Sequence, residues 1–360
     1  MKWIIVTAFP DTGLDQRWRE FLGNADNPAA YTSPDYFRDV LIEGRDAFAV
    51  LALDGPEVVG VVSGVRAGKT IRCGHGGRPQ VSLLAGADPD KRDKIASMLA
   101  QGLRQHAGRS ASLVYVHSWT AIDALARHGF RKRVLAGEEK GIVVLDLSLG
   151  RDALFKGMSE SRRNKVRRAI RNRVEVSPLD CDKEFDAFYE IYRDWCDFKG
   201  FPLEPAEQMK RAFSQTDFRL VLAARHQGAL IAVSLLRFSR LGMGSIEYSA
   251  NWSRREETKA RPNDLLMWRA IEWAINNGLR TFSMGASHFF LRSFGGELVP
   301  TYRYTLDRTP LQQHHLRESG HDLALRVYKG MPEPLRQMAR GARRRVENVM
   351  RRLRQRNRAR

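Results

Sequence analysis

The order of strand and helix signals occurs twice along this chain, and that repetition restricts the fold more than any other feature. Residues 47–66 (AFAVLALDGPEVVGVVSGVR) and 219–239 (RLVLAARHQGALIAVSLLRFS) each contain two apolar runs around a Gly-containing turn, the pattern of a β-hairpin. In both halves helices precede the hairpin, and a strand, a helix and a second strand follow it. A repeat of roughly 150 residues with this order predicts tandem copies of one α/β unit.

We therefore expect an α/β (α+β) protein with two domains, residues 1–150 and 151–310, and a final segment, residues 311–360. The length of 360 residues also exceeds what one hydrophobic core usually serves. The part of the final segment from Met331 differs in kind, because apolar residues recur there at helical spacing among eleven arginines. These apolar residues are Leu335, Met338, Ala342, Val346, Val349 and Leu353. The pattern predicts a basic amphipathic helix with no core of its own.

The net charge of +19 means that the chain attracts anions, and the C-terminal helix carries much of this charge. An apolar stripe beside many arginines is typical of a helix that lies on an anionic membrane, here through residues 335–360. A tail that binds RNA or DNA would have the same composition. We expect tRNA as a possible partner and no DNA partner.

Cysteine usage and hydropathy predict the compartment. The three cysteines form no C-x-x-C pair, which argues against a disulfide framework and a zinc ribbon. The apolar run Ile4–Phe9 is too short for a signal peptide, and no window of about 18 apolar residues follows it. We expect a cytoplasmic protein without a metal site that can associate peripherally with the inner face of the membrane.

Three stretches of the second half resemble the Fem-type branch of the GNAT superfamily of acyltransferases. They are SESRRNKVRRAIRN (159–172), RPNDLLMWRAIEWAINNGLRTFSMGAS (261–287) and FLRSFGGELVPTYRY (290–304). The resemblance implies two tandem GNAT-like domains, the second of them catalytic. It also implies kinship with CelD-like acetyltransferases of polysaccharide biosynthesis.

The resemblance implies transfer of an acyl group from acyl-CoA to an amine or hydroxyl. The acceptor would be an anionic small molecule, or a lipid-linked glycan precursor of the cell envelope or of a polysaccharide. Two alternatives stay open: an aminoacyl-tRNA-dependent aminoacyltransferase of peptidoglycan precursors, and a nucleic-acid-binding protein without enzymatic activity.

A loop and the start of a helix form the expected cofactor site. A strand that leads into a helix N-terminus presents free N–H groups and the positive end of the helix dipole, which together favour phosphate. The residues expected there are Arg254, Arg255, Lys259, Arg261, Asn263 and Asp264. The same loop could equally be a solvated surface loop.

The strand before this loop supplies the candidate catalytic residues, Glu247 and Tyr248. Acyl transfer to an amine needs a base that accepts its proton, and burial would raise the pKa of a carboxyl toward that role. Because side chains alternate along a strand, at most one of the two points into a cleft. The alternative is that Glu247 is a surface residue and Tyr248 a core residue.

The stretch 282–304 supplies the candidate substrate-binding residues, because its glycines permit close backbone approach and its arginine could face an anion. We expect Gly285, Ser287, Arg292 and Gly295 in this role. Arg163 and Arg167, on the basic helix 162–173, are added because that helix suits an anionic substrate. We interpret Phe294, Tyr302 and Tyr304 as core residues.

Overall fold

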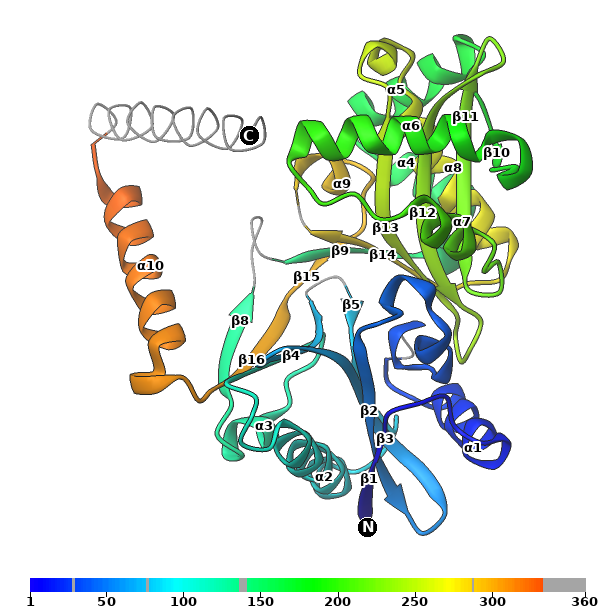
Figure 1. The fold of residues 1–360 in the computed structure, drawn as a ribbon. Coiled ribbons are helices and arrows are strands. Elements are labelled where there is room, and N and C mark those ends of the chain that lie inside the picture. Colours follow the sequence, from blue (N-terminus) through cyan, green and yellow to red (C-terminus); the bar gives the residue numbers. More distant parts are fainter. Residues whose placement is uncertain (28–29, 76–77, 136–140, 287, 333–360) are drawn as a thin grey trace. The chain divides into compact units, whose positions relative to one another are not determined.

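The computed structural model describes residues 1–332 except 28–29, 76–77, 136–140 and 287. The chain forms two compact units, residues 1–306 and 307–360, each described here by itself. The predicted mixed α/β architecture is confirmed, since two sheets and their helices make up the first unit (Figure 1).

The first sheet contains nine strands among the described residues, in the order β1-β2-β3-β4-β7-β16-β8, with β5 on β4 and β6 on β3. These strands are β1 (Lys2–Val6), β2 (Asp46–Asp54), β3 (Glu57–Ala67), β4 (Thr70–His75), β5 (Arg78–Pro79), β6 (Val81–Leu83), β7 (Leu113–Ser118), β8 (Arg131–Leu135) and β16 (Thr301–Asp307). The expected first hairpin is present, because β2 and β3 pair antiparallel around Asp54 and Glu57.

The second sheet contains seven strands of the described chain, in the order β10-β11-β12-β13-β14-β9-β15. They are β9 (Ile142–Asp146), β10 (Glu175–Pro178), β11 (Arg219–His226), β12 (Ala229–Ser239), β13 (Ser245–Ser253), β14 (Thr281–Ala286) and β15 (Glu297–Val299). The expected second hairpin is β11 with β12. Only β13 and β14 pair in parallel in this sheet.

The two sheets exchange strands. The strand β9 belongs to the first half of the chain but pairs with β14 and β15 in the second sheet. Conversely, β16 follows the second sheet in the chain but lies between β7 and β8 in the first. Residues 1–306 are accordingly one compact unit.

Helices cover the sheets, and capping side chains begin several of them. They are α1 (Thr12–Gly23), α2 (Pro89–Ala107), α3 (Asp123–Arg127), α4 (Gly150–Gly157), α5 (Glu160–Arg171), α6 (Cys181–Lys199), α7 (Ala206–Phe213), α8 (Pro262–Asn276) and α9 (Phe289–Arg292). Asp11, Asp88 and Ser159 each accept a backbone N–H at the start of α1, α2 and α5, which satisfies a donor left free by the helix.

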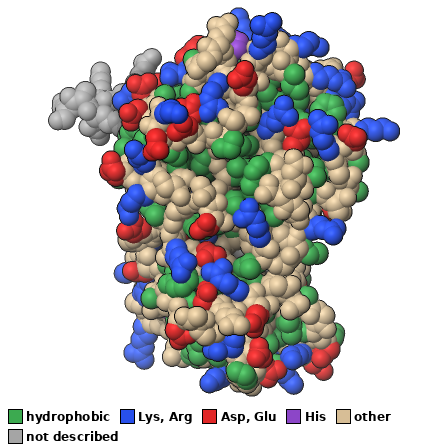
Figure 2. All heavy atoms as spheres, turned by 90° about the vertical axis from the view of Figure 1, so that its right-hand side faces the viewer, with side chains coloured by type: hydrophobic (Ala, Val, Ile, Leu, Met, Phe, Trp, Pro, Cys, Tyr) green, Lys and Arg blue, Asp and Glu red, His purple; other side chains and the backbone are tan. Residues whose placement is uncertain are grey.

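The helices of the second sheet form two layers. One core packs α4, α5 and α8 on one face of the sheet, and a separate core packs α6 and α7 on the other. The apolar side of α5 buries Val166 and Ala169, while its other residues are mostly basic. Figure 2 shows Lys and Arg side chains interspersed with Asp and Glu over the face that it presents.

The second unit begins with Asp307, whose carboxylate accepts the backbone N–H groups of Thr309 and His315, both at 2.9 Å. The helix α10 (Gln313–Gly330) follows. The basic amphipathic helix expected over residues 335–360 lies outside the described residues. Within the described part of the chain, every helix is too short or too polar to span a bilayer.

Candidate active site

The strands β13 and β14 run side by side for only three residue pairs, Ser245–Glu247 with Thr281–Ser283. Beyond these pairs, β13 carries a bulge, because Leu236 is opposite Tyr248 while Leu235 is opposite Ala250. The register of β14 against β9 also shifts, between Ser283 and Gly285. We call residues 247–251 and 283–286 the strand fork. Backbone groups that leave the ladder at such a fork can bind a ligand.

Glu247 is the buried carboxyl of the strand fork, with 2% of its surface exposed. Its Oε2 atom has no hydrogen-bond partner among the described residues. Burial raises its pKa to about 7, although the charges of Arg78 and Arg237 act in the opposite direction. A carboxyl with this pKa is partly ionised at neutral pH and can accept a proton.

Tyr248 is half-buried and packs against the core that contains α8. Burial raises the pKa of its phenol to about 12, so the group stays protonated at neutral pH. The adjacent strand position sends it to the face opposite Glu247. Of the two candidate catalytic residues, Glu247 is therefore the one suited to accept a proton.

Arg78 joins the two sheets at the strand fork. From β5 of the first sheet, its guanidinium donates to the backbone oxygens of Tyr248 at 3.1 Å and Ser249 at 2.9 Å. The role of Arg78 could not be predicted from the sequence, because 170 positions separate it from Tyr248 and no local motif marks it.

Three of the residues expected to bind cofactor lie together at the start of α8. Arg261, at φ +64°, precedes the helix, and its buried Nε atom has no partner in the described residues. Asn263 donates from Nδ2 to Ser253 Oγ at 3.2 Å, whereas its buried Oδ1 atom has no partner there. Asp264 is buried and forms an ion pair with Arg162.

The other three residues of that set belong to the loop. Arg254 donates to the backbone oxygen of Leu230 at 3.2 Å and lies 3.7 Å from a Glu190 oxygen. The guanidinium of Arg255 lies 4.0 Å from the centre of the Phe198 ring. Lys259 is exposed. The structure thus turns Arg254 and Arg255 toward α6 and β12 rather than toward Asn263.

Arg162 is a second residue that the sequence analysis did not single out. It is buried, donates from Nε to Ser293 Oγ at 2.8 Å, and lies 4.2 Å from the centre of the Phe290 ring. Burial and the nearby charge of Arg261 lower its pKa to about 10, which leaves it cationic at neutral pH. Through its ion pair with Asp264, it connects α5, the start of α8 and the segment around α9.

Arg163 and Arg167, the two expected substrate-binding residues of α5, contact residues of α4. Arg163 donates to the backbone oxygen of Lys156 at 2.8 Å, and Arg167 lies 5.5 Å from the centre of the Phe155 ring. Both line a cavity of about 450 Å³ between α4, α5 and α8, with Trp268 in its wall.

Among the remaining substrate-binding candidates, Gly285 has φ +83° and open space where a Cβ atom would project. At Gly295, φ is +85° and a Cβ atom would lie 3.0 Å from the backbone oxygen of Gly157. Gly295 thus permits close packing on α4. Arg292 is half-buried at the end of α9, and Ser287 lies outside the described residues.

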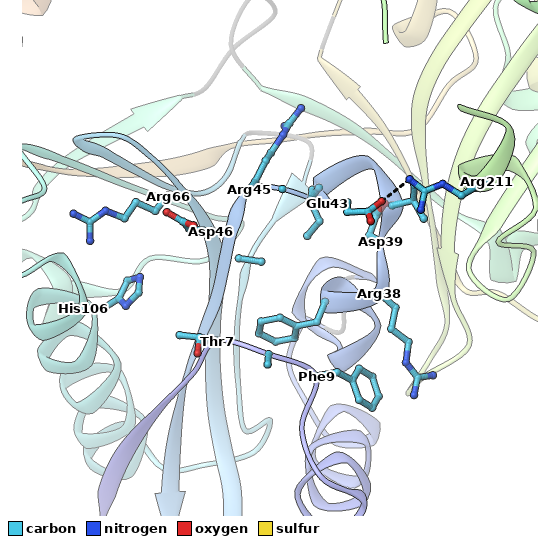
Figure 3. A pocket seen from close by; sticks show the side chains of 16 residues that line it. Thr7, Phe9, Arg38, Asp39, Glu43, Arg45, Asp46, Arg66, His106 and Arg211 are labelled. Atoms are coloured by element: carbon cyan, nitrogen blue, oxygen red, sulfur yellow. Dashed lines mark hydrogen bonds and ion pairs between the residues drawn. The ribbon is translucent and has the colours of Figure 1, made fainter. Parts of the chain in front are cut away.

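A cavity of about 740 Å³ opens between residues of the first half of the chain and Arg211 of α7, and we call it the arginine pocket (Figure 3). Its wall includes four arginines, namely Arg38, Arg45, Arg66 and Arg211. The guanidinium of Arg38 lies 3.6 Å from the centre of the Phe9 ring and forms no ion pair with the described residues. Glu43 pairs with Arg211 at 2.7 Å, Arg45 lies 3.8 Å from a Glu204 oxygen, and Asp46 also lines the wall, so Arg38 is an arginine whose charge lacks a carboxylate partner among the described residues there.

Asp39 connects the arginine pocket to the strand fork. It lies in the wall of the pocket, and its buried carboxylate forms ion pairs with Arg219 of β11 and Arg237 of β12. Arg237 is in turn the register partner of Glu247 on β13. Within the described residues, no three His, Cys, Asp or Glu side chains gather as they would around a metal ion.

Residues 160–293 match the family model described as "Acetyltransferase (GNAT) domain". Among solved structures, FemX has a similar fold, with a TM-score of 0.65, 13% identity, and coverage of 87% of this chain and 99% of that one. A tandem GNAT protein from the clavulanic acid biosynthesis pathway has a TM-score of 0.52 and 14% identity, covering 86% of this chain and 99% of that one.

The C-terminal domain of a putative lysylphosphatidylglycerol synthetase from Agrobacterium fabrum is also similar. Its TM-score is 0.55 at 11% identity, covering 85% of this chain and 95% of that one. No curated protein matches the chain closely enough in sequence to count as a relative. At these identities the likeness establishes a shared fold.

Proposed function

We propose that the chain transfers an acyl group from acyl-CoA, because residues 160–293 match the GNAT acetyltransferase model and the chain is similar in fold to FemX and to a tandem GNAT protein. The acceptor would be an amine or hydroxyl of an anionic precursor of the cell envelope or of a polysaccharide, including lipid-linked forms. The observation that carries the proposal is Glu247, a buried carboxyl without a partner on Oε2 at the strand fork, with a pKa of about 7.

The residues at the start of α8 fit acyl-CoA. Arg261 Nε and Asn263 Oδ1 are buried polar atoms without a described partner, and a buried polar atom favours a ligand that completes its hydrogen bonds. Arg261 would attract phosphate beside the helix N-terminus, and Asn263 would accept a hydrogen bond from the ligand. Bound acyl-CoA would supply the activated carbonyl.

Glu247 would accept the proton that the acceptor amine loses as it attacks. A base in a buried site is most effective when its pKa is close to the operating pH, which holds for this carboxyl. Arg78 fixes the backbone of the bulge next to it and would keep the carboxyl in place. Gly285 leaves open space on the opposite strand of the fork, which suits the passage of an extended ligand.

The arginine pocket suits the anionic part of the acceptor. Arg38 is held on Phe9 without a carboxylate partner in the described chain, so a phosphate or carboxylate would meet an uncompensated charge. Asp39 in the wall of this pocket pairs with Arg237, which is the register partner of Glu247. The proposal requires that the reacting group of an acceptor bound there extends to the strand fork.

Calorimetry and a spectrophotometric assay of thiol release test the proposal. Wild type should bind acetyl-CoA or a longer acyl-CoA with micromolar affinity, and Arg261→Ala should weaken this binding at least tenfold, because it removes a phosphate partner. Arg255→Ala, in the same loop but with its guanidinium on the Phe198 ring and away from Asn263, is the matched control. Acyl-CoA binding that survives in Arg261→Ala would contradict the assigned site.

One observation favours aminoacyl transfer from tRNA as a second candidate. On and just after α5, Arg167, Arg168, Arg171 and Arg173 are exposed, and none forms an ion pair within the described residues. Such a face suits an RNA backbone, and binding would then weaken steeply with salt. The absence of acyl-CoA binding, together with salt-sensitive binding of charged tRNA, would favour this candidate. RNA binding without any transfer would favour a nucleic-acid-binding protein.

We also propose that the protein works at the cytoplasmic face of the membrane, where residues 335–360 would bind anionic lipid. The support is the charge and apolar spacing of that sequence. A chain that ends at residue 332 should lose binding to vesicles containing phosphatidylglycerol but keep acyl-CoA binding. Unchanged vesicle binding would contradict this assignment.

A further inference from the structure

Asp39 is a single buried carboxylate between two buried arginines. It precedes a short 3-10 turn (Val40–Ile42) and forms ion pairs with Arg219 and Arg237, and each of the three side chains is less than a tenth exposed. Burial alone would raise the pKa of Asp39, but the charges of Arg237 and Arg219 bring it below its ordinary value. Asp39 is therefore ionised at neutral pH.

Arg237 has two possible carboxylate partners. It is the register partner of Glu247 on the neighbouring antiparallel strand, so the two side chains share one face of the sheet, where opposite charges normally attract. The structure instead pairs Arg237 with Asp39 and directs one of its N–H groups to the backbone oxygen of Ala30 at 3.3 Å. In the described residues the Glu247 carboxylate forms no ion pair, and its Oε2 atom has no hydrogen-bond partner.

We propose that Asp39 is a positioning residue that binds the guanidinium of Arg237 and so keeps the Glu247 carboxyl free to accept a proton. The role in catalysis rests on the proposed acyl transfer, whereas the effect on Glu247 does not. A residue of the first half of the chain would then control the base that the second half supplies.

The charges around these groups fix the direction of the effect. Arg237 from β12 and Arg78 from β5 act on the Glu247 carboxyl, while β14 places Ser283 opposite it. Asp39, Tyr31, Tyr36 and Glu247 act on Arg237. Without the charge of Asp39, Arg237 would be uncompensated and free to turn toward Glu247, which favours the ionised carboxylate. Without Arg219, Asp39 would compensate Arg237 more fully, and the protonated Glu247 would be favoured.

The test is a ¹³C NMR titration of the full chain labelled at glutamate carboxyls, with Glu247→Gln to assign the resonance. Asp39→Asn should lower the pKa of Glu247 by about 1 unit or more, whereas Arg219→Gln should raise it. If Asp39 contributed only to stability, both variants would be less stable than wild type, but the pKa of Glu247 would not shift in opposite directions in the two. An unchanged or raised pKa of Glu247 in Asp39→Asn overturns the proposal.

The titration needs no substrate, so it separates this inference from the proposed function. If acyl transfer is detected, the acid limb of kcat/KM should move to lower pH in Asp39→Asn, in parallel with the NMR result. If no transfer is detected with any donor, the proposed function fails. The shifts in the pKa of Glu247 measured by NMR then still decide whether Asp39 controls this carboxyl. Where Asp39→Asn does not fold, Arg219→Gln decides: a raised pKa supports the proposal, and an unchanged or lowered one overturns it.

Discussion

The guanidinium of Arg78 donates to the backbone oxygen of Ser249 at 2.9 Å, and this bond joins the first sheet to the bulge of β13 in the second. The same guanidinium also binds the backbone oxygen of Tyr248 and lowers the pKa of Glu247 by its charge. One side chain therefore supports both the shape and the electrostatics of the strand fork.

Replacing Arg78 should affect stability and pH dependence together. Arg78→Met should lower the free energy of unfolding by about 1–3 kcal/mol, because two carbonyl groups lose their donor. It should also raise the pKa of Glu247, since a positive charge is lost, and move the acid limb of kcat/KM to higher pH. Urea denaturation and a pH-rate profile measure the two effects. Arg78→Lys keeps the positive charge and serves as the control. If the pH-rate profile moves equally in both variants, the charge of Arg78 does not set the pKa of Glu247.

Glu247→Gln should reduce kcat for acyl transfer by about 10²–10⁴-fold, because the amide cannot accept the proton. Tyr248→Phe is the matched control on the neighbouring position and should lose less than about tenfold, since its phenol stays protonated at neutral pH. Steady-state kinetics of both variants test the assignment. Equal losses in the two would mean that Glu247 is not the base.

The same glutamine variant should change the dependence of stability on pH. The folded-state pKa of Glu247 is about 7 against an ordinary value of 4.5, so the folded state binds the proton more tightly. Between these pH values the wild type therefore loses stability as pH rises, by about 3 kcal/mol in total. Glu247→Gln should lack this loss and be the more stable protein at pH 8, with little difference near pH 4.5. Urea denaturation of both proteins at pH 4.5 and pH 8 measures this difference. If the carboxyl titrates normally, the difference in stability between wild type and Glu247→Gln will be the same at both pH values.

Arg162→Met should be strongly destabilising. It leaves the buried Asp264 without its cation, and breaking a buried pair in this way costs about 3–5 kcal/mol. Arg168→Met, on the exposed side of the same helix, should change stability by no more than about 0.5 kcal/mol. Chemical denaturation compares the two. If Arg162→Met is as stable as Arg168→Met, the ion pair with Asp264 makes no net contribution.

Two glycines with similar backbone angles should respond differently to alanine. Both Gly285→Ala and Gly295→Ala place a side chain at positive φ, at a cost of about 1–2 kcal/mol. Gly295→Ala should cost about 1–3 kcal/mol more, because its Cβ atom would meet the backbone oxygen of Gly157 at 3.0 Å. Gly285→Leu should weaken acyl-CoA binding, since its side chain enters the strand fork. Denaturation and calorimetry measure these effects, and equal stability of the alanine variants would argue against the close approach at Gly295.

The local features of this fold could be predicted from the sequence. Apolar runs around turns that contain Gly55 and Gly228 predict both hairpins, which the structure confirms. The exchange of β9 and β16 could not be predicted, because each strand has the same apolar character as the strands of its own half. Strand pairing across such distances depends on packing that no local pattern carries.

The candidate site divides in the same way. The position of Glu247 on a strand before a helix was visible in the sequence, but its burial was not, because it depends on Arg237 on the next strand and on residues of the first half. Asp39 and Arg78 are far from Glu247 in sequence and belong to no motif. Their contribution comes from long-range contacts, and the burial that raises the pKa of Glu247 likewise depends on the packing of the whole fold.

Because β16 lies within the first sheet, that sheet cannot be completed during synthesis until β16 has been made. The strand β8 joins that sheet through β16, which is made about 170 residues later, after the whole second sheet. A nascent chain that stops before Thr301 therefore leaves an open edge beside β7 and an unpaired β8, both prone to association with other strands. Chaperones that bind extended apolar segments would meet this protein at that stage of translation.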